Sequence, residues 1–189
     1  MTTRKTAAAR HRPDAAPSRG VMRRSYASTV RLSASPEAVF ERLDDQTRLA
    51  EHMEQPSPMM GGGRMTYEFD PGRGQVVGSH IRMGGSAFGL SLFVDEVVTE
   101  RDPPRRKVWR TVGDTRLIVV GAYEMGFEIQ SEAAGSKLRV WIDYDLAPTA
   151  TGRWFGSILA PVYARWCVGR MASDAAEHFS LPALRLTAA

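Results

Sequence analysis

Two histidines stand where a general acid or base could act. His80 and Arg82 alternate with Ile81 and Met83 along an expected strand, so a base would lie beside an anion clamp, as the cyclisation or dehydration of a polyketone requires. The same alternation puts both side chains on the polar face, and we therefore interpret them as a solvated edge. His52 follows a short expected helix, where a surface histidine at a helix end is the simpler interpretation.

Two tyrosines combine an apolar position with a polar group. Tyr123 and Tyr144 fall on the apolar faces of their expected strands, yet each hydroxyl needs a hydrogen-bond partner when it is buried. In a cavity these hydroxyls would orient a ligand's carbonyl or hydroxyl group, whereas in a solid core they would bond to the backbone. Cys167 has no neighbouring histidine to lower its pKa, which indicates a buried, unreactive thiol.

Metal and phosphate chemistry find little support in the residue pattern. The chain has four histidines and one cysteine, with no HExxH motif or paired-cysteine spacing, so we expect no metal and no other cofactor. The glycine pairs and triplets are not followed by a lysine and a Ser/Thr opening a helix, so they are expected to form loops. A single cysteine excludes an intrachain disulfide and is typical of a reducing compartment. Together with the Arg- and Ala-rich composition, it predicts a bacterial cytoplasmic protein.

The positive charge of the chain lies at one end. Seven Lys or Arg residues against Asp14 give residues 1–24 a charge of +6, which leaves −2 of the total +4 for the remainder. We therefore expect no nucleic-acid partner and predict a disordered basic tail over residues 1–22, with a second tail over 182–189. The apolar stretches are shorter than the roughly 20 residues of a membrane span, so no integral membrane segment is expected.

The elements that must position these residues follow from hydrophobic periodicity. Apolar and polar residues alternate in seven segments, near residues 25–33, 64–69, 76–83, 88–99, 106–112, 117–130 and 137–146. The breaks include Gly84-Gly85-Ser86 and Gly113-Asp114. Ser35-Pro36 predicts the start of a short helix, and Thr47–Met53 predicts a second one. Short turns between consecutive strands imply antiparallel pairing.

The strongest helical pattern spans residues 152–180. Leu159, Val162 and Trp166 fall at helical spacing, so this face must be buried, and the only large apolar surface upstream is the sheet. Pro161 is expected to kink the helix. The space between sheet and helix is the predicted ligand site, with no catalytic residue assigned. Its expected lining consists of Tyr123, Tyr144, Met125, Phe127, Leu90, Leu92, Ile142, Leu159, Val162 and Trp166.

Three segments carry a resemblance to a known superfamily: ASPEAVF from Ala34, GQVVGS from Gly74 and DPPRRKVWR from Asp102. With the order of elements, they make the chain resemble the START-like SRPBCC superfamily, which includes START lipid-transfer domains, birch-pollen-allergen-like (Bet v 1-like) proteins and bacterial polyketide cyclase/dehydrase-like proteins. The resemblance implies an α+β helix-grip fold over residues 23–181. In that fold a seven-stranded antiparallel sheet wraps around a long C-terminal helix, and two short helices follow the first strand.

Three functions are compatible with this resemblance. We prefer binding or transport of a hydrophobic small molecule, such as a lipid, an isoprenoid or an aromatic polyketide, because the expected cavity residues include no clear acid or base. The alternative is an enzyme of the polyketide cyclase/dehydratase type that uses a histidine or tyrosine in the same cavity. The third is a protein-interaction module of the chaperone-activator type, recruiting its partner through an outer surface that includes Trp141.

Overall fold

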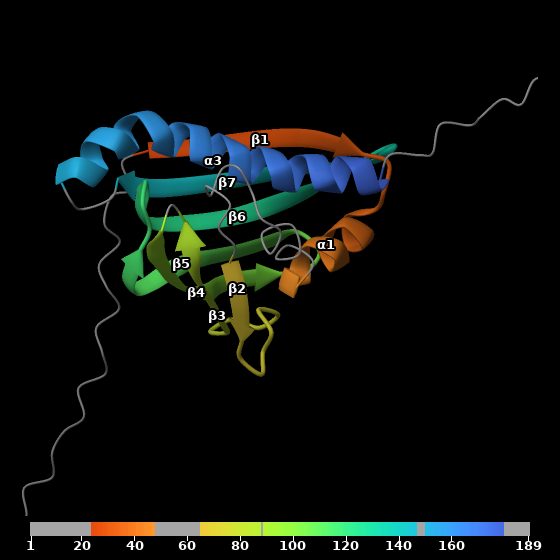
Figure 1. Ribbon diagram of the computed structural model, residues 1–189. Helices are drawn as coiled ribbons and strands as arrows, with labels where there is room; N and C mark the ends of the chain where they lie inside the picture. Colours follow the sequence, from red (N-terminus) through yellow and green to blue (C-terminus); the bar gives the residue numbers. More distant parts are fainter. Residues whose placement is uncertain (1–23, 48–64, 88, 147–149, 180–189) are drawn as a thin grey trace, which may run out of the picture.

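The computed structural model describes residues 24–47, 65–87, 89–146 and 150–179 of the 189-residue chain (Figure 1). Both predicted tails, and the expected helix Thr47–Met53 apart from its first residue, lie outside these ranges. Within them the chain order is β1 (Arg24–Leu32), α1 (Pro36–Asp44), β2 (Met65–Phe69), β3 (His80–Ala87), β4 (Leu90–Asp102), β5 (Arg106–Arg116), β6 (Val120–Glu132), β7 (Gly135–Leu146) and α3 (Ala150–Phe179).

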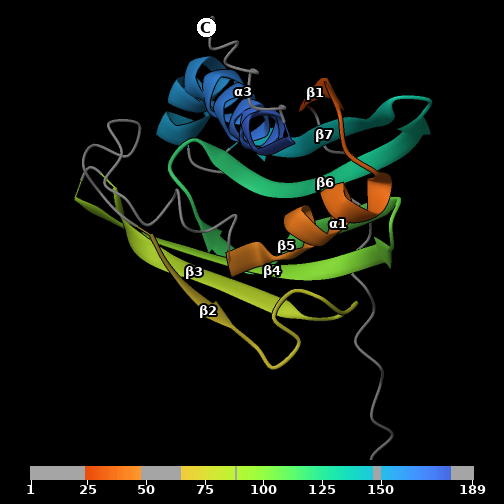
Figure 2. The ribbon, with the colours of Figure 1, turned by 90° about the vertical axis from the view of Figure 1, so that its right-hand side faces the viewer.

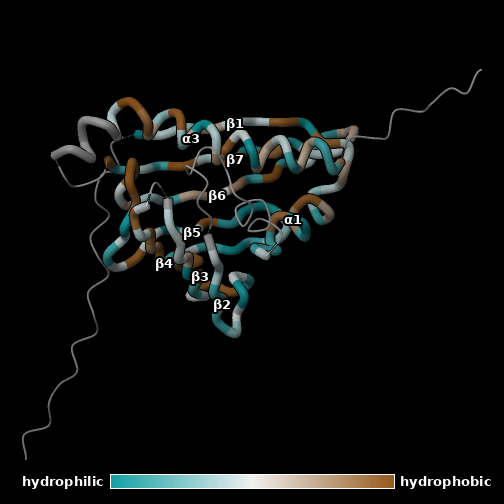
Figure 3. The backbone as a smooth tube through the Cα atoms, in the orientation of Figure 1, coloured by the Kyte–Doolittle hydropathy of each residue, from teal (hydrophilic) through white to brown (hydrophobic). Residues whose placement is uncertain are grey.

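The seven strands form one antiparallel sheet in the order β1-β7-β6-β5-β4-β3-β2. Figure 2 shows the sheet curving from β1 and β7, which lie beside α3, round to β2 and β3 on the opposite side. Brown and teal segments alternate along the strands in Figure 3, as period-two patterning requires. The predicted helix-grip architecture, with its antiparallel sheet and long C-terminal helix, is confirmed.

Strand β3 begins later than predicted. Residues 76–79 form a turn rather than the start of a strand. The carboxylate of Asp70 accepts hydrogen bonds from the backbone N–H groups of Gly72 (3.0 Å) and His80 (2.8 Å). This carboxylate closes the 70–80 connection by satisfying backbone donors at both of its ends.

Two predicted breaks are absent. Strand β3 continues through Gly84 and Gly85, because both residues are paired on one side with β2 and on the other with β4. Strand β5 likewise continues through Gly113 and Asp114 to Arg116. In β3, pairing on both sides overrides the local turn preference of glycine. In β5, Gly113 keeps a left-handed backbone (φ 65°) at an irregularity where the register with β4 shifts, so the strand passes the turn signal through a bulge.

Helix α1 starts as its sequence predicts. Ser35 is the N-cap and its hydroxyl accepts from the N–H of Ala38 at 3.4 Å, while Pro36 occupies the first turn. The buried face includes Val39 and Phe40, and the Phe40 ring meets Phe127 edge-on with the centroids 5.6 Å apart. This contact seats α1 against the inner face of β6.

Helix α3 packs on the sheet through small residues, which corrects the predicted face. Ala160, Ala164 and Val168 are fully buried, whereas Leu159 and Val162 are 45% and 53% exposed. Alanines let the helix axis lie close to β1 and β7, and Leu159 and Val162 are turned away from this interface. Pro161 lies inside the helix. Among the described residues, no helix is both long enough and apolar enough to cross a bilayer.

A buried ion cluster joins the end of α1 to the sheet. The ammonium of Lys107, fully buried on β5, lies 2.9 Å from the Asp44 carboxylate and donates to the Asp44 carbonyl oxygen, also at 2.9 Å. Arg101 on β4 donates to the same carboxylate at 2.8 Å. Burial alone would raise the pKa of Asp44, but the hydrogen bonds from Arg101 and Lys107 outweigh it and the pKa is lowered.

We predict that Asp44→Asn lowers the free energy of unfolding by about 3–5 kcal/mol at pH 7, because Lys107 is left buried without its anion. Urea denaturation measures this, with Glu41→Gln on the exposed side of α1 as the matched control. Since the folded-state pKa of Asp44 is depressed, its contribution is present above the unfolded-state pKa and is lost as the pH falls. The difference between wild type and variant should therefore shrink in acid, and equal unfolding curves at pH 7 would contradict the assignment.

Candidate functional site

A single carboxylate lies in the middle of the concave face of the sheet. On β4, Leu92, Val94, Glu96 and Val98 share the buried face, and Glu96 is only 5% exposed. Its Cα is paired with Ile81 on one side and with Thr111 on the other. Period-two alternation therefore places a charged side chain where the neighbouring positions are apolar.

The hydroxyl of Tyr123 is the main partner of this carboxylate. Tyr123, on the inner face of β6, donates from its hydroxyl to Glu96 Oε1, across the intervening strand β5. The Trp109 side chain on β5 also hydrogen bonds Glu96. Thr111 holds Tyr123 in place, since its hydroxyl accepts from the Tyr123 N–H at 3.0 Å and donates to the Tyr123 carbonyl at 3.3 Å. That side chain replaces a ladder bond just beyond the last paired residues of β5 and β6.

Helix α3 adds two polar side chains above this pair. Tyr163 and Cys167 lie one turn apart and hydrogen bond to each other, and both interact electrostatically with Glu96. Although Cys167 keeps some exposed surface, burial of its thiol raises the pKa to about 12. The Cys167 thiol next to it, together with burial, raises the pKa of Tyr163 well above its usual value. Both groups are neutral at physiological pH, and Cys167 is a poor nucleophile.

The pKa of Glu96 is raised to about 7. Burial is the largest cause, and the hydrogen bond from Tyr123, the charge of Lys107 and the hydrogen bond from Trp109 only partly oppose it. The same burial, with the Glu96 charge next to it, raises the pKa of Tyr123 well above 10. At neutral pH the site therefore holds a carboxyl group that exchanges a proton readily beside a tyrosine that stays protonated, a pairing suited to donating and accepting protons or hydrogen bonds.

The predicted lining residues divide into two groups. Tyr144, Met125, Phe127 and Ile142 are buried in the core, and Phe127 is held between the rings of Phe40 and Trp109. Leu92 is 9% exposed and belongs to the same cluster. These side chains form the base of the concave face.

The second group lies at one end of this face. Leu90 is 56% exposed at the start of β4, and Leu159 and Val162 keep about half of their surface on the first half of α3. Trp166 is partly buried, with its ring 6.2 Å from that of Tyr163. Phe93, near the start of β4, pairs with Arg116 at the end of β5. Val119 follows three residues later, and Gly156 of α3 approaches its carbonyl closely. The start of β4 and the first half of α3 therefore lie at the same end of the sheet. We call Leu90, Leu159 and Val162 the apolar rim.

The residues first considered for histidine chemistry lie elsewhere. His80 Nδ1 is 2.8 Å from Asp95 Oδ1 on the outer face of the sheet, where Arg82 also contacts Asp95 at 3.5 Å. His52 is outside the described residues. The structure therefore separates His80 and Arg82 from the Glu96 site.

Trp141 offers little surface to a partner. It lies on the outer face but is 7% exposed, with the Arg106 guanidinium 5.8 Å from its ring. Gly126 permits this packing, because a Cβ there would stand 3.0 Å from the Trp141 ring and 2.7 Å from the carbonyl of Lys107. Arg106 thus covers the indole that the interaction hypothesis needs.

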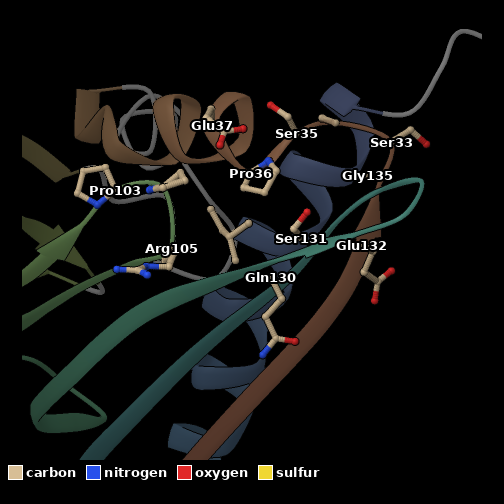
Figure 4. A pocket seen from close by; sticks show the side chains of 13 residues that line it. Ser33, Ser35, Pro36, Glu37, Pro103, Arg105, Gln130, Ser131, Glu132 and Gly135 are labelled. Carbon is tan, nitrogen blue, oxygen red and sulfur yellow. The ribbon is translucent and has the colours of Figure 1, made fainter.

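A separate open groove of about 1060 Å³ lies at the other end of the sheet (Figure 4). The start of α1, the Pro103-Pro104 turn and the β6–β7 turn form its walls. Pro36, Pro103 and Ile129 line it together with the exposed Glu37, Arg105 and Gln130, so its surface is mixed. The charged side chains at its walls and its open shape distinguish it from the enclosed apolar site expected for a hydrophobic ligand.

Sequence reasoning missed Glu96, Trp109 and Tyr163. The signal for Glu96 was present, since it is the one acid in the apolar register of Leu92, Val94 and Val98. The partnership with Tyr123 carries no such local signal, because 27 residues separate the two. Within the described ranges, no group of three His, Cys, Asp or Glu side chains could hold a metal ion.

We predict that Glu96 makes folding stability depend on pH. Its folded-state pKa is raised from 4.5 to about 7, so the stability associated with its neutral form is present below pH 4.5 and is lost as the pH rises through 7. Relative to Glu96→Gln, wild type should lose on the order of 3 kcal/mol over this interval. Urea unfolding from pH 4 to 8 measures the difference, with the exposed Glu68→Gln as the control. Parallel curves for wild type and Glu96→Gln would show that Glu96 ionises normally.

Solved structures share this fold at low sequence identity. Protein CV1439 from Chromobacterium violaceum is 17% identical, with a TM-score of 0.56 over 84% of this chain and 99% of that one. A Thalictrum flavum norcoclaurine synthase point mutant in complex with a transition-state analogue is 14% identical, with a TM-score of 0.58 over 82% and 93%. Panax ginseng major latex-like protein 151 is 13% identical, with a TM-score of 0.51 over 84% and 97%. These likenesses establish the fold alone.

Family membership comes from the sequence itself. No curated protein matches the chain significantly. A family model described as polyketide cyclase / dehydrase and lipid transport matches residues 23–178, which cover β1 through nearly all of α3. The chain therefore belongs to the polyketide cyclase / dehydrase and lipid transport family, within the START-like SRPBCC superfamily.

Proposed function

We propose that this protein binds or transports a hydrophobic small molecule, a lipid, an isoprenoid or an aromatic polyketide, between the sheet and α3. The observation that carries the proposal is the apolar rim of Leu90, Leu159 and Val162, which keeps about half of its surface exposed beside a concave apolar face. Large apolar side chains exposed together on a protein often mark a ligand or partner surface. The family, whose description includes lipid transport, supports the same function.

The geometry gives the ligand a direction. The apolar rim lies at the end of the site, and exposure falls along β4 from 56% at Leu90 to 9% at Leu92 and 2% at Val94 before Glu96 is reached. An apolar body would be held at about 25 cal/mol per Å² of surface removed from water. A polar end would meet the Glu96–Tyr123 pair, so that few polar groups fix the orientation, as in most small-molecule sites.

Acid–base catalysis is the second candidate, favoured by the Glu96–Tyr123 pair. An enzyme of the cyclase/dehydratase type needs a titratable group in the site, and Glu96 supplies one whose pKa is about 7. One of the fold neighbours is a synthase. Retained substrate binding with lost turnover in Glu96→Gln would favour this candidate over binding alone.

Three other expectations from the sequence remain proposals. An interaction module would need an outer surface other than Trp141, whose ring is covered. The proposed location in a bacterial cytoplasm rests on the composition of the chain and on its single cysteine. The absence of a nucleic-acid partner rests on the net negative charge of residues 25–189.

A neutral fluorescent probe tests the proposed function. N-phenyl-1-naphthylamine should bind wild type with enhanced fluorescence, and Leu159→Glu should weaken its binding by about tenfold, because a charge is placed at the apolar rim. Val77→Glu is the matched control, since Val77 is 61% exposed and lies in the turn before β3. Absence of binding to wild type would refute the proposal, and equal loss in both variants would place the site away from the rim.

A further inference from the structure

The polar end of the site is already supplied with hydrogen-bond donors from the sheet. The Tyr123 hydroxyl donates to Glu96 Oε1, and Trp109 also hydrogen bonds the carboxyl group. Both donors are therefore committed to Glu96. When Glu96 is protonated, its own O–H is the group that remains to be donated, and its natural acceptor is an oxygen of a bound molecule.

The cations near the site are committed elsewhere. Lys107 is fully buried and bound to the carboxylate and carbonyl of Asp44. Arg101 donates to the same carboxylate. On β1, Arg24 donates to the carbonyl of Ser157 at 3.1 Å and to Tyr144. Each of these three side chains is thus engaged with a protein partner other than Glu96, and Lys107 could leave Asp44 only by giving up a buried ion pair.

We infer that the ligand presents a neutral oxygen, a ketone or hydroxyl, to Glu96, and that the site rejects carboxylates such as fatty acids. This inference rests on the proposed function and specifies the chemical class that the site accepts. A ligand carboxylate would lie beside the carboxyl group of Glu96 in a buried setting with no uncommitted cation from Lys107, Arg101 or Arg24. At pH 6, where Glu96 is mainly protonated, the carboxylate bears the cost of burial without a cation. As the pH rises through 7, it also lies beside an ionised Glu96, and two like charges in such surroundings repel strongly.

The groups that face Glu96 determine the pH at which selectivity changes. Tyr123 from β6, Trp109 from β5, and Tyr163 and Cys167 from α3 are neutral at pH 7. Lys107 from β5 is paired with Asp44, and the Asp95 carboxylate lies on the outer face beside His80. Glu96 is therefore the group that changes charge near neutrality. As the pH rises, Glu96 loses the proton through which it donates a hydrogen bond to a ketone. The affinity for ketones should therefore fall.

Displacement of N-phenyl-1-naphthylamine by matched pairs tests the inference. The pairs are 2-dodecanone with dodecanoate and 2-acetylnaphthalene with 2-naphthoate, so that each pair differs mainly in charge. At pH 6 wild type should prefer the ketone by about tenfold or more. In Glu96→Gln, the neutral amide should make both the ketone affinity and the preference for the ketone independent of pH, whereas in wild type both change through pH 7.

Tyr123→Phe provides a second variant that keeps the carboxyl group. Removal of the Tyr123 hydrogen bond, which lowers the pKa of Glu96, should move the midpoint of the fall in ketone affinity to higher pH. A purely structural role of Tyr123 would lower affinity at all pH values without moving the midpoint. Unfolding curves establish that each variant is folded before it is scored.

Three results would count against the inference. If carboxylates displace the probe as well as the ketones do, the inference is overturned while the proposed function stands. If wild type and Glu96→Gln show the same preference for ketones over carboxylates and the same pH dependence, Glu96 does not determine which ligand is bound. If neither member of either pair, nor the probe itself, binds wild type, the proposed function fails and the inference fails with it.

Discussion

The buried pairing of Lys107 with Asp44 is the constraint on which the rest of the structure depends. A fully buried ammonium is tolerated only with an anion in contact, and Asp44 supplies both its carboxylate and its carbonyl at 2.9 Å. Because Asp44 ends α1, the pair joins that helix to β5, and Arg101 adds β4 through the same carboxylate. The helix is thereby held at a defined place on the concave face, with Phe40 against Phe127.

This commitment of Lys107 shapes the chemistry of Glu96. The lysine lies two residues before Trp109 on the same strand face, near enough to lower the pKa of Glu96, yet burial remains the larger effect and the pKa stays at about 7. Had the ammonium been bound to Glu96 itself, the carboxyl group would have stayed ionised. The cation is used for architecture, and the site keeps a carboxyl group whose proton is exchangeable at neutral pH.

The two sides of helix α3 differ in the size and burial of their side chains. Its alanines let the backbone approach β1 and β7, and Val168 and Met171 fill the interface beside them. Leu159 and Val162 are left exposed on the flank of the helix. Leu159 lies one turn before Tyr163, and Val162 directly precedes Tyr163 in sequence. The helix therefore closes the core with one face and contributes to the proposed ligand site with another.

Local pattern alone determined the order of the elements. Period-two alternation, the Ser35-Pro36 helix start and the apolar C-terminal helix depend on neighbouring residues, so strand number, antiparallel pairing and the inward position of Tyr123 and Tyr144 could be predicted. Only the tertiary structure decided that β3 runs through Gly84-Gly85, that alanines face the sheet, and that Tyr123 bonds Glu96 two strands away. These outcomes depend on strand register and on helix-to-sheet distance, which are set by contacts between residues far apart in the chain.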